Sequence, residues 1–127
     1  MKLKSQGMAV LVLSVLSLAL YGCAKKADTN KSVEQIKSEV QHMTSADIEA
    51  YAQAYVKEIT AKKGEVDKVA DQLKSISPME LLGEKAKSIK SQISNIESDV
   101  SKLTERYQVY AQKYQELGGD ASKISIQ

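Results

Sequence analysis

Between residues 45 and 117, apolar residues recur at alternating intervals of three and four positions, which is the spacing of a coiled-coil seam. The seam within residues 45–76 comprises Ile48, Ala52, Tyr55, Ile59, Val66, Val69, Leu73 and Ile76, with Lys62 at one seam position. The seam within residues 82–117 comprises Leu82, Ala86, Ile89, Ile93, Ile96, Val100, Leu103, Tyr107, Tyr110, Tyr114 and Leu117. The pattern therefore predicts an all-α fold built on two long helices.

The segment Ser77-Pro78-Met79-Glu80 separates the two seams and carries helix-start signals. Serine suits the N-cap, proline suits the first helical turn, and glutamate completes a capping box, so we expect the later helix to begin here. Because the residue before a proline disfavours helical geometry, we expect the chain to fold back into a long antiparallel helical hairpin, a coiled coil. One long helix kinked at Pro78 is the alternative.

Folding at Ser77 also predicts a register. For a fold at Ser77, residues that face each other across the antiparallel seam should have numbers that add to roughly 155. This register would bring Asp71 near Lys85, and Glu49 near Arg106. Opposite charges would then face each other across the hairpin.

A short additional helix is expected before the hairpin. Ser32-Val33-Glu34-Gln35 has the form of a capping box, apolar residues follow at helical spacing, and Thr44 offers a second cap where this helix ends or bends. Gly118-Gly119 should end the last helix. We therefore expect the helical domain to cover residues 32–118, and a flexible tail to follow at 119–127. Residues 23–31 are polar and without period after the cysteine, which predicts a flexible tether.

Cys23, the only cysteine of the chain, follows an apolar run. Residues 1–22 have a short basic start, an apolar stretch at 8–20 and the small residue Gly22, as a secretory signal peptide has. An ordinary secreted protein with a free thiol is one interpretation, although an unpaired thiol is a liability in an oxidising compartment. The tetrad Leu20-Tyr21-Gly22-Cys23 resembles the lipobox of bacterial lipoproteins.

That resemblance implies cleavage between Gly22 and Cys23, and a covalent diacylglycerol and an N-acyl chain such as palmitate on Cys23. It also implies a location on a membrane of the bacterial cell envelope. Ala24 stands where an aspartate would favour the inner membrane, so the outer membrane, facing the periplasm, is the expected site in a Gram-negative cell.

The remaining composition argues against several functions. The chain has 18 basic and 16 acidic residues, but two of the lysines lie in the signal peptide, so the rest is formally neutral and nucleic acid is not an expected partner. His42 is the only histidine and has no second ligand at metal-binding spacing. We therefore expect no catalytic residue, no metal site and no cofactor apart from the lipid, and hence no enzyme.

The sequence favours a membrane-anchored helical scaffold or docking module of the envelope. A periplasmic chaperone-like or clamp-like protein that binds a client polypeptide is the alternative. Leu81 lies off the seam beside Met79, so these two residues are candidates for contact with an envelope protein, unless they only close the turn. Assembly of several copies through the coiled coil is also compatible with the pattern.

Overall fold

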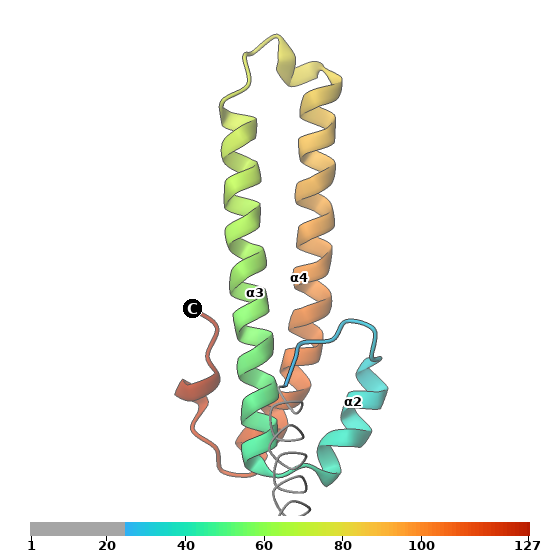
Figure 1. The fold of residues 1–127 in the computed structure, drawn as a ribbon, viewed down its shortest axis with the longest axis vertical. Helices are drawn as coiled ribbons and strands as arrows, with labels where there is room; N and C mark the ends of the chain where they lie inside the picture. Colours follow the sequence, from blue (N-terminus) through green and yellow to red (C-terminus); the bar gives the residue numbers. More distant parts are fainter. Residues whose placement is uncertain (1–24) are drawn as a thin grey trace, which may run out of the picture.

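The structure is a computed structural model that describes residues 25–127. Helices α3 (Ser45–Lys74) and α4 (Glu84–Glu116) lie side by side as an antiparallel hairpin (Figure 1). The predicted all-α hairpin is confirmed, and the single kinked helix is wrong. At 1.5 Å per residue, the 30 residues of α3 span about 45 Å.

The turn of the hairpin differs from the prediction. The chain leaves α3 after Lys74, forms the 3-10 helix η2 (Glu80–Leu82), and starts α4 only at Glu84, with Gly83 as an extended N-cap. The carbonyl of Ser77 accepts hydrogen bonds from the amides of Glu80 and Leu81, at 3.0 and 3.2 Å. Ser77 and Pro78 therefore start a compact turn and not the long helix.

This longer turn changes the register of the hairpin. Tyr51 stacks on Tyr110, and Glu49 binds Tyr114, so partner numbers add to about 162, one heptad beyond the predicted sum. A shift of one heptad keeps the same helix faces together, which is why the seams still meet. In the described part of the chain, the predicted charge pairs between the two long helices do not form. The ion pairs among residues of α3 and α4 instead join two residues of the same helix.

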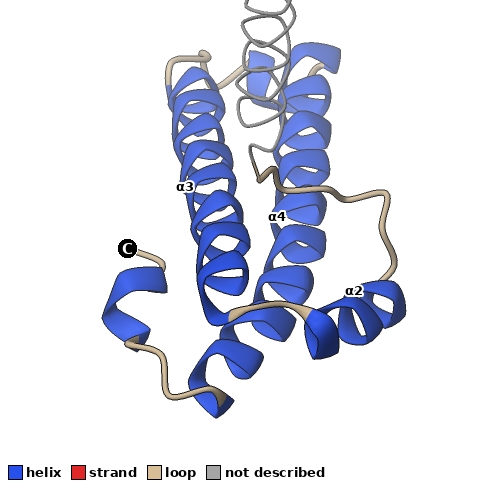
Figure 2. Cartoon of the chain, turned by 60° about the horizontal axis from the view of Figure 1, so that its bottom comes forward, coloured by secondary structure: helices blue, strands red, loops and turns tan. Residues whose placement is uncertain are grey.

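The core is thickest at the base of the hairpin, which we define as the end opposite the turn. There α2 (Val33–Glu39) packs beside the hairpin (Figure 2) and continues into the 3-10 helix η1 (Val40–His42). Ile36 and Val40 of these two helices are buried. Towards the turn only two helices remain, and a smaller cluster forms around Ile76, Ala86 and Ile89. The seam predictions for Leu82 and Leu117 are wrong, since their exposed fractions are 89% and 48%.

The predicted helix starts at the N-terminal side are confirmed. The Ser32 hydroxyl accepts the amide hydrogen bond of Gln35 at 3.1 Å, and the Gln35 side chain accepts from the amide of Ser32 at 3.0 Å. The Thr44 hydroxyl accepts from the amide of Asp47 at 3.2 Å and caps α3. These reciprocal bonds satisfy amides that a helix start leaves free.

The segments at both ends of the domain have fixed contacts, where the sequence predicted a flexible tether and a flexible tail. Tyr55 exchanges two hydrogen bonds with the backbone of Asp28, at 2.8 and 3.1 Å. Ile124, in the 3-10 helix η3 (Ala121–Ile124), is buried, and its carbonyl accepts the hydroxyl of Tyr107 at 2.6 Å. The backbone of Asp28 and the carbonyl of Ile124 make these hydrogen bonds, so a pattern of side-chain polarity did not indicate them.

Candidate functional site

The turn of the hairpin exposes three large apolar side chains, which we call the apolar tip: Met79, Leu81 and Leu82. Their exposed fractions are 91%, 39% and 89%. Ile76 closes the hairpin below the turn and is buried with Ala86. The apolar tip is therefore not part of the closing core, and Leu82 joins Met79 and Leu81 as a surface residue.

Two ion pairs lie beside the apolar tip, each within its own helix. Lys74 lies 3.1 Å from Asp71, and Lys87 lies 3.4 Å from Glu84. Exposed pairs of this kind contribute only a few tenths of a kcal/mol to folding. Each pair has no net charge, so these two pairs give the surroundings of the apolar tip no excess of either sign.

The base of the hairpin carries a cluster of tyrosines. The rings of Tyr51 and Tyr110 stack with centroids 5.1 Å apart, and Tyr55 lies 5.5 Å from Tyr110. The hydroxyl of Tyr114 donates to Glu49 at 2.6 Å. These rings form a wide core, and several of their hydroxyls bind the end segments or the facing helix.

The protonation of these tyrosines follows from this environment. Burial raises the pKa of Tyr55, Tyr107 and Tyr110 above the ordinary value for a phenol. The hydrogen bond to Glu49, followed by burial, raises the pKa of Tyr114. All four hydroxyls are therefore proton donors at neutral pH, in keeping with their structural role.

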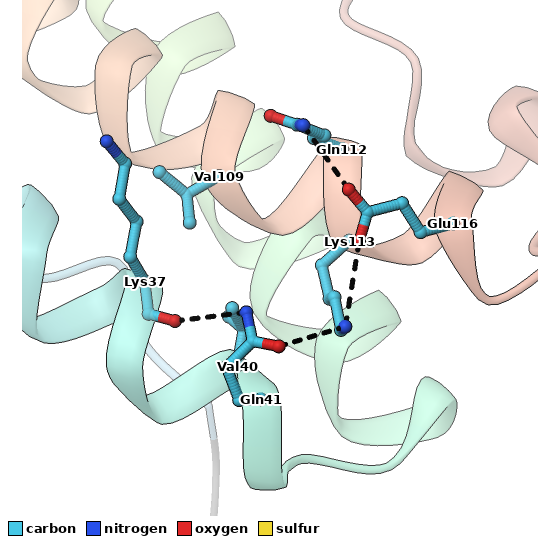
Figure 3. Close-up of a pocket in the computed structure, with 7 residues that line it drawn as sticks. All are labelled: Lys37, Val40, Gln41, Val109, Gln112, Lys113 and Glu116. Atoms are coloured by element: carbon cyan, nitrogen blue, oxygen red, sulfur yellow. Dashed lines mark hydrogen bonds and ion pairs between the residues drawn. The ribbon is translucent and has the colours of Figure 1, made fainter.

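A shallow groove lies between α2, η1 and the end of α4 (Figure 3). Its polar groups bind one another: the Lys113 ammonium donates to Gln41 at 3.2 Å and lies 3.6 Å from Glu116, which also accepts from Gln112 at 3.3 Å. Val40 and Val109 form its apolar floor. The groove is a polar seam that joins α2 to α4, and Lys113 and Glu116 pair with each other inside it.

His42 is exposed in η1, and residues 25–127 contain no group of three His, Cys, Asp or Glu side chains placed to hold a metal ion. In the same range, no helix has the length and apolar character needed to cross a membrane. The predicted signal peptide, its cleavage at Gly22 and the lipidation of Cys23 lie outside the described residues.

Comparison with protein-family models, with curated proteins and with solved structures found no match for this chain. Of the predicted contact residues, Met79 is fully at the surface and Leu81 partly so. Leu82 was missed because it continues the spacing of the seam, and only the break at Gly83 moves it outside the paired helices.

Proposed function

We propose that this protein is a non-catalytic docking module of the bacterial cell envelope, anchored in a membrane by lipid on Cys23. The module presents its apolar tip to an envelope protein. The observation that carries the proposal is the exposure of Met79 and Leu82 at one end of a long hairpin, while the N-terminal segment that leads to Cys23 packs at the other end.

The energetics of the apolar tip support a binding role. Burying a leucine or methionine side chain completely is worth about 1.5 to 3 kcal/mol, and folding of this chain obtains only a small part of that from Met79 and Leu82. A partner with an apolar pocket would obtain it. Three adjacent side chains suit a small, specific contact, whereas a clamp for client chains needs an extended apolar face.

The length of the hairpin supports a spacing role. The 30 residues of α3 separate the base from the turn by about 45 Å. A lipid at the base would keep the apolar tip away from its own membrane, within reach of a partner in the periplasm. The outer membrane is the proposed anchoring site, on the lipobox resemblance and Ala24.

The anchor is tested by mass spectrometry of the mature N-terminus and by membrane fractionation. We expect an acylated Cys23 as the first residue and a protein that sediments with membranes. The variant Cys23→Ser should remain an uncleaved precursor without lipid. A normally processed, membrane-bound Cys23→Ser protein would contradict the anchor.

The apolar tip is tested with Met79→Ser and Leu82→Ser, and Leu117→Ser is the matched control. Leu117 is an exposed apolar residue at the base, so its change removes a similar surface from the other end. After crosslinking in cells and purification of the lipoprotein, we expect one defined partner to be lost in the tip variants and kept in the control. Equal recovery in all three variants would exclude docking by the tip, and many unrelated partners would favour the client-binding alternative.

A further inference from the structure

The segment before α2 is fixed to the base of the hairpin from its first described residue. The Lys25 ammonium lies 3.4 Å from the carboxylate of Asp47 and 5.1 Å from the ring centroid of Tyr51. Further along, Arg106 donates hydrogen bonds to the carbonyls of Thr29 and Lys31, at 3.0 and 2.8 Å. Contacts with both long helices therefore hold this segment along its whole length.

These contacts shorten the connection to the anchor. Only Ala24 separates Cys23 from Lys25, and two residues span at most about 7 Å when fully extended. A flexible tether over residues 23–31 would allow about 30 Å by the same measure. A lipid on Cys23 would hence hold the first turns of α3 close to the headgroups of its bilayer.

One side of the base has the chemistry for such a contact. Lys26 and Lys57 are exposed and surround a shallow hollow together with Lys25, Ala27, Ala54 and Glu58. Lys25 is paired with Asp47, and Glu58 offsets part of the remaining positive charge. A small positive excess is left beside the chain end, and such an excess favours anionic phospholipid headgroups.

The positive excess does not extend along the same face of α3 towards the turn. Residues at helical spacing beyond Ala54 are Glu58, Lys62, Glu65 and Lys68, with equal numbers of each sign. Lys62 and Glu65 also lie 3.3 Å apart. The charge distribution therefore gives the hairpin no reason to lie flat on an anionic surface.

We infer that the face formed by Lys26, Ala54 and Lys57 lies against the headgroups of the bilayer that holds the Cys23 lipid, closer to them than the apolar tip. This inference rests on the proposed lipid anchor. It replaces a protein on a loose tether with one whose N-terminal half of α3 is held against the membrane.

The test uses the full-length acylated protein in vesicles of phosphatidylethanolamine and phosphatidylglycerol that contain headgroup spin-labelled lipid. Since Cys23 is the only cysteine and its thiol is consumed by the lipid, one introduced cysteine can carry a fluorophore. Lys57→Cys and Lys68→Cys form a matched pair, because eleven residues are about three turns and return to the same face of α3. Met79→Cys reports the apolar tip.

We expect the spin-labelled headgroups to quench the fluorophore at position 57 at least threefold more than that at position 68, and to leave position 79 almost unquenched. A second variant with ten glycine and serine residues inserted between Ala24 and Lys25 should lower quenching at position 57 to that at position 68, with the same fraction of protein on the vesicles. Equal quenching at 57 and 68 without the insert, or no effect of the insert, would overturn the inference.

The failure of this inference can be told apart from the failure of the proposed function. Acylated, vesicle-bound protein without quenching at position 57 overturns the docked base alone. A mature protein without acyl chains that stays off membranes overturns the lipid anchor, and the docked base with it.

Discussion

The same leucine-to-alanine substitution at Leu103 and at Leu82 should have different effects on stability, because only Leu103 lies in the core. Both continue the apolar spacing of the second seam, but Leu103 is 2% exposed in the base core and Leu82 is 89% exposed in the turn. Replacing leucine by alanine removes three carbon atoms, worth about 0.8 kcal/mol each when buried. We expect Leu103→Ala to lower the free energy of unfolding by about 2.5 to 3 kcal/mol, near the low end of the known range because a thin core relaxes around the cavity.

Leu82→Ala is the matched control and should change the free energy of unfolding by less than about 0.5 kcal/mol, as exposed positions do. Urea unfolding of a soluble form that starts at Ala24, followed by circular dichroism at 222 nm, measures both variants against the parent. The midpoint should fall for Leu103→Ala with an unchanged slope. Similar losses in both variants would refute the placement of Leu82 outside the core.

Three other predictions follow from contacts at the base and in the hairpin. A Cβ at Gly119 would collide with the ring of Tyr114, so Gly119→Ala should destabilise the domain and expose the amides of the tail to hydrogen exchange. A Cβ at Gly64 meets no neighbour, so Gly64→Ala should stabilise α3 by up to about 1 kcal/mol. Similar changes in stability for both variants would contradict the packing of Gly119 on Tyr114. The folded state raises the pKa values of Tyr55, Tyr107, Tyr110 and Tyr114, so their contribution to stability is present below pH 10 and is lost as the pH rises beyond it. The urea midpoint should therefore fall from about pH 9 to pH 11, and titration of these four phenols near pH 10 in the intact fold would contradict this prediction. In a Cys23→Ser background, the pair Val69→Cys and Ile93→Cys should form a disulfide within one chain, and the pair Val69→Cys and Ala86→Cys should not; the reverse result would restore the predicted register.

Much of the architecture could be predicted from the sequence, because each long helix carries its own apolar periodicity and the caps at Ser32 and Thr44 are local signals. The register could not, since shifting an antiparallel pair by one heptad leaves the same faces in contact. Only the length of the turn decides between the two registers. That length depends on Gly83, whose extended backbone delays the start of α4 beyond Pro78.

The surfaces at the two ends were predicted less well. Met79 and Leu81 could be identified because they lie outside the seam, but Leu82 lies within its spacing and becomes exposed only through the turn. The fixed N-terminal segment was missed because Tyr55 and Arg106 bind its backbone, and a backbone atom leaves no mark in the sequence.

The proposed docking of an envelope protein on the apolar tip of a lipid-anchored hairpin can be tested directly in cells. In the most direct measurement, a photoreactive amino acid replaces Leu82 of the acylated protein in living cells. The control carries it at Lys68, an exposed position within α3. Illumination should give one discrete protein adduct from position 82 and none from position 68, and Cys23→Ser should abolish the adduct. No adduct from position 82, or equal adducts from both positions, would contradict the claim.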